Sequence, residues 1–75
     1  MSWRAEVIEA MPLGVEMTAP EIAQRIRPNM AEWERRTCIS RVYKSLVTEE
    51  SYHSVVRAGT VKIRGKEVVL WKRVA

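Results

Sequence analysis

The chain of 75 residues contains no Asp and no Phe, and it holds one His, one Cys and three Gly. A Ser-His-Asp triad cannot be built without Asp. A metal site would need scattered Glu side chains, because His53 and Cys38 share no ligand spacing. Three glycines leave no room for a glycine-rich phosphate loop. We therefore expect no enzymatic activity, no metal and no cofactor.

Long apolar runs are also missing, and the single Cys38 excludes an internal disulfide. No stretch approaches the roughly 18 apolar residues of a membrane helix. The chain opens without the basic and apolar regions of a secretory signal. These features predict a cytoplasmic protein with no membrane partner. A chain of this length makes one small domain over residues 1–75, with a modest core and no deep substrate cavity.

Charge is divided unevenly along the sequence. Residues 1–34 contain three Arg and six Glu, whereas residues 35–75 contain ten Lys or Arg and three Glu. The net charge of +4 therefore arises from the second half of the chain. Such asymmetry concentrates positive potential on one part of the fold, as expected of a protein that binds a polyanion.

Two short helices are predicted in the first half. Trp3, Val7 and Met11 fall on one arc of a helix that Ser2 can cap and Pro12 ends. The sequence from Thr18 to Glu21 matches a capping box, which predicts a second helix of about two turns ending before Pro28. Residues 15–17 form either a small strand or an ordinary loop.

A third helix is predicted from about Met30 to Val47, with Asn29 and Glu32 as a second possible capping box. Ile39, Val42, Tyr43 and Leu46 form a core stripe at helical spacing. Upstream, charged residues occupy the same stripe: Glu32, Arg35 and Arg36. The start of this helix therefore either projects beyond the core or is broken near Arg35.

A β-hairpin is predicted after residue 54, where β-branched and basic residues alternate. Ala58 and Gly59 suggest a bulge in its first strand. If Gly65 and Lys66 are the central turn residues, Ile63 faces Val68 and Val61 faces Leu70.

This order of elements resembles a winged helix-turn-helix domain over nearly the whole chain. The resemblance rests on helix 1, a possible short strand, helix 2 beginning TAPEIA, helix 3 containing RRTCISRVYKSLV, and the hairpin TVKIRGKEVVLWKRV. The helix pair is similar to that of many small prokaryotic and phage regulators. The expected fold is therefore α+β, with three helices followed by a hairpin wing.

The resemblance implies sequence-specific binding of double-stranded DNA by a small transcriptional regulator. Helix 3 would enter the major groove, with Arg41 and Lys44 at base edges and Arg36, Thr37 and Ser40 beside them. In the wing, Lys62, Arg64 and Lys66 would contact the backbone or the minor groove. One departure is the ten residues between Ile26 and Thr37, where a compact helix-turn-helix has a turn of three or four.

Two other functions fit the same pattern. Met30 and Trp33 lie on the outer side of helix 3, where they either pack against a neighbouring segment or form an anchor for a protein partner or a second copy. A protein-docking winged helix is therefore one alternative, and an excisionase-like architectural factor in recombination is another. Trp3, Tyr43 and Trp71 are expected in the core.

Overall fold

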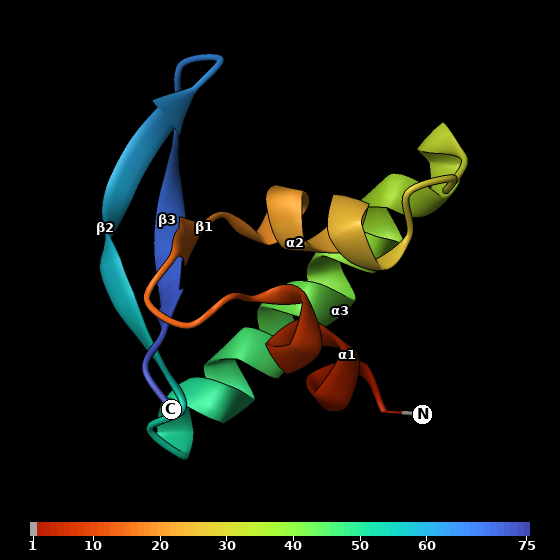
Figure 1. Ribbon diagram of the computed structural model, residues 1–75. Coiled ribbons are helices and arrows are strands. Elements are labelled where there is room, and N and C mark those ends of the chain that lie inside the picture. The colour runs from red at the N-terminus through yellow and green to blue at the C-terminus, as the bar shows by residue number, and fades with distance from the viewer. Residues whose placement is uncertain (1) are drawn as a thin grey trace.

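Three helices and a three-stranded antiparallel sheet make up the computed structural model, which describes residues 2–75 (Figure 1). The elements follow one another as α1 (Trp3–Ala10), β1 (Glu16–Met17), α2 (Ala19–Ile26), α3 (Glu32–Ser51), β2 (Val55–Ile63) and β3 (Lys66–Arg73). This confirms the α+β class, the number of helices, the short strand before α2 and the terminal hairpin. The helices gather on one side of the sheet, and the hairpin rises beyond them.

The last turn of α1 contains no basic residue of its own. Side chains from other elements cap the C-terminal end of this helix. Arg73 Nη1 donates to the carbonyl oxygens of Ile8 at 3.2 Å and Met11 at 3.3 Å. Arg25 Nη1 donates to the carbonyl oxygen of Ala10 at 3.2 Å. These bonds bring side-chain donors to carbonyl oxygens at the end of the helix and tie α1 to both β3 and α2.

The predicted capping box at the start of α2 is confirmed. Thr18 Oγ1 accepts from the backbone amide of Glu21 at 3.4 Å, and Glu21 Oε1 accepts from the amide of Thr18 at 3.1 Å. Ile22 and Ala23 are fully buried against the core. The helix stops at Ile26, two residues before Pro28, as the sequence predicts.

The third helix differs from its prediction at both ends. It begins at Glu32 after Ala31, which provides no side-chain cap, so the expected capping box at Asn29 is wrong. It continues past Val47 to Ser51. The extra turn is held because Glu49 is 6% exposed and accepts from Arg4 Nε at 2.7 Å, joining α3 to α1.

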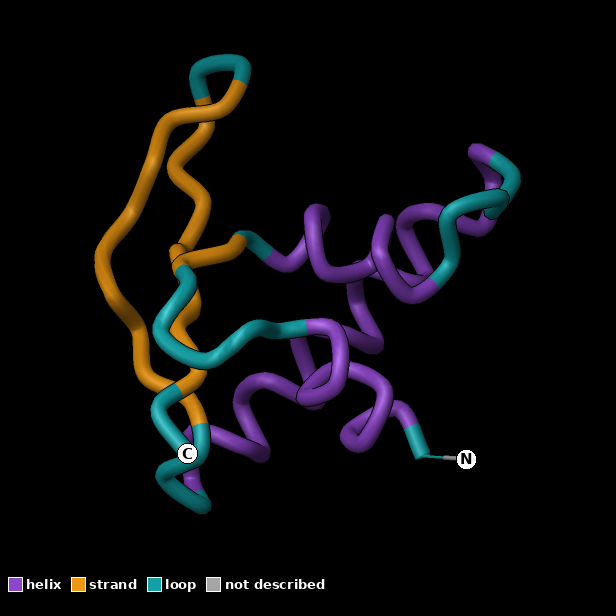
Figure 2. The backbone as a smooth tube through the Cα atoms, viewed as in Figure 1, coloured by secondary structure: helices purple, strands orange, loops and turns teal. Residues whose placement is uncertain are grey.

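The start of α3 projects beyond the core and is not broken near Arg35. Residues 27–31 connect α2 to α3, as the loop in Figure 2 shows, and residues 32–36 form the first turns of α3. The unusually long segment between the two helices is therefore a loop of ordinary length followed by an extended start of the helix.

The sheet has the order β1-β3-β2, so β3 is the only strand with a neighbour on both sides. Trp71 lies opposite both Met17 of β1 and Arg57 of β2. The expected bulge is confirmed, since Ala58 is unpaired between the pairs Arg57–Trp71 and Gly59–Leu70. This central position of β3 fixes the direction in which the hairpin leaves the helices.

The hairpin turn lies one residue earlier than expected. Its central residues are Arg64 and Gly65, with φ of 52° and 78°. Two left-handed residues in succession match the type I′ turn that suits the twist of a two-residue hairpin. Val61 therefore faces Val68 and Ile63 faces Lys66, which corrects the predicted register.

One core joins the helices to the sheet. Its fully or almost fully buried side chains are Val7, Met11, Ile22, Ala23, Val42, Leu46, Val55 and Trp71. Trp71 is in the core as expected, while Trp3 is only half-buried against it. Tyr43 departs from the expectation, because it is 43% exposed and meets Trp71 edge-on with ring centroids 6.0 Å apart.

The capping box gives a direct test of the fold. Thr18→Ala should lower the free energy of unfolding by about 1 to 2 kcal/mol, because it removes the acceptor for the first amides of α2. Ser2→Ala is the matched control: Ser2 accepts one bond at 3.3 Å at the exposed start of α1, so its loss should cost about 0.5 kcal/mol. Urea denaturation measures both. Equal losses would show that the box adds nothing beyond an ordinary cap.

Candidate nucleic-acid interface

The thirteen Lys and Arg side chains divide into two groups according to their partners. Five arginines donate to other parts of the protein: Arg4, Arg25, Arg27, Arg57 and Arg73. Three of them form ion pairs, with Glu49, Glu6 and Glu50 as the partners of Arg4, Arg27 and Arg57. The hydrogen bond to the carboxylate is the main cause that raises the pKa of each of these three guanidinium groups. These five cations stabilise the fold.

The other eight cations make no side-chain hydrogen bond or ion pair within residues 2–75. They are Arg35, Arg36, Arg41, Lys44, Lys62, Arg64, Lys66 and Lys72. All but Lys72 lie on α3 between Arg35 and Lys44 or at the tip of the hairpin. The unpaired positive charge is therefore concentrated on two elements that are far apart in the sequence.

A shallow groove on the exposed side of α3 collects the five residues that the sequence proposed for this helix. Arg36, Thr37, Ser40, Arg41 and Lys44 line a space of about 510 Å³. No acidic residue occurs between Arg35 and Thr48, so about four helical turns carry only positive and neutral side chains. We call this surface the α3 groove.

A second groove lies between α2 and the tip of the hairpin, with a volume of about 530 Å³. Ile63, Arg64, Lys66 and Val68 of the hairpin lie on one side of it. Its other lining residues are Thr18, Pro20, Glu21 and Gln24, together with Arg35 from the start of α3. We call this surface the wing groove.

Arg35 is the site residue that the sequence did not identify. Helical periodicity placed it on the core stripe of α3, where a charged residue has no obvious role. In the structure Arg35 is exposed, because it lies in the start of α3 that projects beyond the core. Arg35 thus brings a third cation to the wing groove, beside Arg64 and Lys66.

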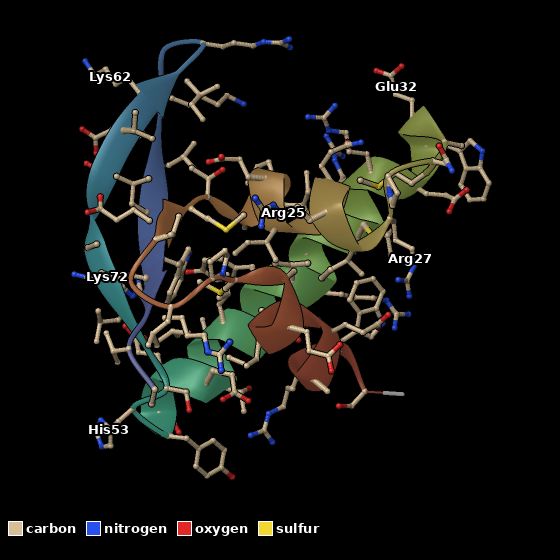
Figure 3. The ribbon with its side chains drawn as sticks, viewed as in Figure 1. Arg25, Arg27, Glu32, His53, Lys62 and Lys72 are labelled. Atoms are coloured by element: carbon tan, nitrogen blue, oxygen red, sulfur yellow. The ribbon has the colours of Figure 1, made fainter. Side chains whose placement is uncertain are left out.

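Lys62 is separated from the other hairpin cations. It lies opposite Glu67, whereas Lys66 lies opposite Ile63 on the other face of the hairpin. Figure 3 shows Lys62 pointing away from the helices, and it lines neither groove. The structure therefore brings Arg64 and Lys66 together with Arg35 and leaves Lys62 apart.

The two grooves are neighbours on the surface. Arg35 lines the wing groove, and Arg36, the next residue of α3, lines the α3 groove. In Figure 1 the hairpin tip and the start of α3 both project beyond α2, which lies between them. A ligand long enough to touch both projections would therefore contact cations from two elements at once.

The two acidic residues near the start of α3 do not enter either groove. Glu32 projects from the end of the helix in Figure 3, where a negative charge also suits the helix dipole. Glu34 lies on the side that faces the loop after α2. Neither carboxylate therefore lies among the cations that line the two grooves.

Met30 and Trp33, the expected anchor for a protein partner, are separated by their exposure. Met30 is half-buried and packs against the core, which is the first of the two alternatives expected for it. Trp33 is 82% exposed. Of these two residues, only Trp33 therefore has an exposed side chain that a partner could contact.

Arg64 adopts a left-handed backbone conformation that side chains other than Gly and Asn rarely take. A cation at this position costs some stability that Asn or Gly would not. Strain of this kind is often kept where a side chain is needed for another purpose. At the tip of the hairpin the chain therefore carries the positive charge of Arg64 at a position where the backbone conformation favours Asn or Gly.

Neither a metal-binding cluster nor a membrane-spanning helix is found among the described residues. No cluster of three His, Cys, Asp or Glu side chains able to hold a metal occurs within the part of the chain that the structure describes. None of the described helices has the length and hydrophobicity needed to cross a membrane. Comparison with protein-family models, curated proteins and solved structures gives no match for this chain.

The strain at Arg64 can be tested by mutation. Arg64→Asn should raise the free energy of unfolding by up to about 1 kcal/mol, because Asn tolerates the left-handed conformation. Arg64→Ala removes the same charge but keeps an unfavourable Cβ, so its stability should stay within about 0.5 kcal/mol of the original. Both variants are compared by urea denaturation. If Asn is no more stabilising than Ala, the backbone at this turn is not strained.

Proposed function

We propose that the chain is a winged helix-turn-helix protein that binds double-stranded DNA in a sequence-specific manner as a small regulator. The order of the elements supports this, with α2 and α3 as the helix pair and the hairpin of β2 and β3 as the wing. Fold alone does not determine function. The proposal therefore depends on the surface that these elements carry.

The observation that carries the proposal is that the cations paired within the protein lie apart from those without a partner. Five arginines are engaged within the protein, and seven of the eight unpaired cations lie on α3 between Arg35 and Lys44 or at the hairpin tip. Glu6, Glu49 and Glu50 are paired with three of these five arginines, and Glu21, the one carboxylate that lines the wing groove, accepts from Thr18. Such a surface has the charge and the spread of a phosphate-binding footprint.

In this arrangement α3 lies in the major groove. Arg41 and Lys44 can donate to guanine acceptors, and Thr37 and Ser40 can contact several base edges. Arg36 is one turn closer to the start of the helix and reaches bases or phosphate. These residues share the α3 groove, which has no carboxylate to compete with the bases.

The wing groove would hold the DNA backbone beside that major groove. In helix-turn-helix complexes the first helix of the pair crosses the backbone, which places α2 and its neighbour, the wing groove, at the phosphates. Arg35, Arg64 and Lys66 meet there from two elements. They would position the duplex without reading its sequence.

A protein-docking function is the second candidate, because Trp33 is exposed and aromatic side chains are common anchors in interfaces. Its distinguishing feature is that binding through Trp33 would survive high salt, whereas binding through the two grooves would not. An architectural recombination factor would use the same grooves and would show cooperative binding to repeated sites.

Salt dependence of DNA binding is the primary test. Fluorescence anisotropy with a random duplex should show binding at about 50 mM salt that weakens on the order of 10³-fold at about 200 mM, because about six phosphate contacts release counterions. The absence of salt-sensitive binding would reject the DNA-binding proposal in favour of docking through Trp33.

Single substitutions test whether DNA binds at the two grooves. Arg35→Gln should weaken binding about tenfold at low salt and lower the slope of log affinity against log salt by about one unit. Lys72→Gln is the matched control, since it removes the same charge from an unpaired cation that lines neither groove. Equal effects of the two variants would show that only net charge matters.

The two grooves should differ in what they contribute to specificity. Replacing Arg41 should weaken binding and relax the sequence preference, with a loss of about 1 to 3 kcal/mol on the preferred duplex. Replacing Arg64 should weaken binding to all duplexes alike, because phosphate contacts carry no sequence information. Selection from a random duplex pool, followed by anisotropy on preferred and scrambled sites, measures this. If replacing Arg41 weakens binding to preferred and scrambled duplexes equally, Arg41 of α3 does not recognise bases.

A further inference from the structure

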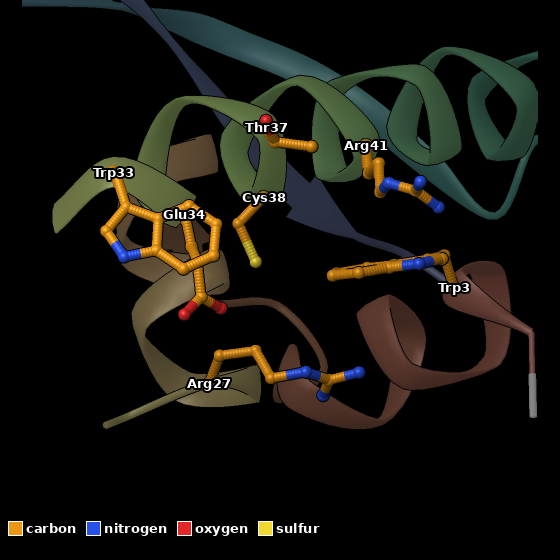
Figure 4. Close-up of a pocket in the computed structure, with 7 residues that line it drawn as sticks. All are labelled: Trp3, Arg27, Trp33, Glu34, Thr37, Cys38 and Arg41. Atoms are coloured by element: carbon orange, nitrogen blue, oxygen red, sulfur yellow. The ribbon is translucent and has the colours of Figure 1, made fainter. Parts of the chain in front are cut away.

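A small cleft opens between α1 and the first half of α3, on the side away from the wing (Figure 4). Trp3 and Trp33 stand at its two ends, and Thr37, Cys38 and Arg41 of α3 complete this part of its lining. The Cys38 sulfur points into the space between the two indoles. We call this the aromatic cleft.

Both faces of the Trp3 ring are covered by guanidinium groups. The Cζ atoms of Arg27 and Arg41 lie 4.9 Å and 5.8 Å from the ring centroid, and Figure 4 shows them on opposite sides of the indole. Trp3 therefore presents its edge to the cleft. An aromatic ring offered to that edge could adopt the edge-to-face geometry that such pairs prefer.

The volume of the cleft limits the size of a ligand. It is about 190 Å³. An apolar cavity of about 150 Å³ holds benzene. The cleft therefore has space for one aromatic ring with a small substituent, and a larger ligand would have to extend into solvent past Trp33.

The charges around the cleft determine which substituent fits. Arg27 already binds Glu6, with Nη1 to Oε1 at 2.9 Å, while Arg41 has no carboxylate partner in the described chain. A guanidinium and a carboxylate can form two parallel hydrogen bonds. Glu34 also lines the cleft, nearer to Trp33 than to Arg41 in Figure 4, so a carboxylate is favoured only at the Arg41 end.

We propose that the aromatic cleft binds a small aryl carboxylate, with its ring between Trp3 and Trp33 and its carboxylate on Arg41. Arg41 and Thr37 line both this cleft and the α3 groove. A ligand on Arg41 would therefore remove a donor from the DNA-binding surface. This second step rests on the proposed DNA binding, and it makes the aryl carboxylate an effector that weakens DNA affinity.

The binding step is tested without DNA, by tryptophan fluorescence of the full chain titrated with benzoate. We expect a saturable change with a Kd on the order of 1 mM, as is usual for so small a ligand. Benzamide has the same shape without the charge and should bind at least about tenfold more weakly. A change that does not saturate, or one that benzamide reproduces, would overturn the proposal.

Substitutions at three exposed residues test where the ligand binds in the cleft. Arg41→Gln keeps all three Trp and should weaken benzoate binding about tenfold or more. Trp33→Ala should abolish the fluorescence change, and Glu34→Gln should strengthen binding severalfold because it removes a repelling carboxylate. Urea denaturation checks that each variant is folded. Wild-type benzoate affinity in Arg41→Gln or a weaker affinity in Glu34→Gln would contradict the assigned orientation.

The coupling to DNA is measured by repeating the anisotropy titration at saturating benzoate, with sodium acetate at equal concentration as the ionic control. Benzoate should weaken DNA binding about tenfold relative to acetate, and Arg41→Gln should remove the difference. Benzoate binding with no DNA affinity would reject the proposed function and leave the cleft assigned. DNA affinity that benzoate does not change would reject the effector role.

Discussion

Burial of Trp71 in β3, the central strand of the sheet, is the interaction on which the rest of the structure depends. Its side chain is 1% exposed, it lies opposite Met17 and Arg57, and Tyr43 of α3 meets it edge-on. Because β3 is bonded to both other strands, this one side chain fixes the sheet against the helices. The hairpin tip is thereby held at a set distance from α3, and the wing groove exists only because of that placement.

Local chemistry explains which parts of the fold the sequence could predict. The capping box at Thr18 and the stop before Pro28 depend on residues within one or two turns, so their outcome could be predicted without a structure. The hairpin turn was placed one residue late because Gly65 suits either turn position. Only the pairing of β2 with β3 shows that Arg64 also adopts the left-handed conformation.

The candidate site likewise has residues that the sequence could predict and residues that it could not. Arg36, Thr37, Ser40, Arg41 and Lys44 share one helical face, so periodicity grouped them correctly, and the structure places them around one groove. Arg35 could not be predicted as a site residue, because its exposure depends on how far the start of α3 projects beyond the core, which no pattern within α3 reveals. Lys62 was grouped with Arg64 and Lys66 by sequence distance, although strand alternation puts it on the other face of the hairpin.

A single map of the bound surface tests the central claim that DNA lies across α3 and the wing. Two-dimensional amide NMR of the labelled chain, titrated with a short duplex at low salt, reports every residue at once. The account predicts shifts confined to residues 18–24, 35–44 and 63–68, with little change at Arg4 and Glu49, which form an ion pair at the far end of α3. Shifts centred on Trp33 without the hairpin tip, or no shifts at all, would contradict it.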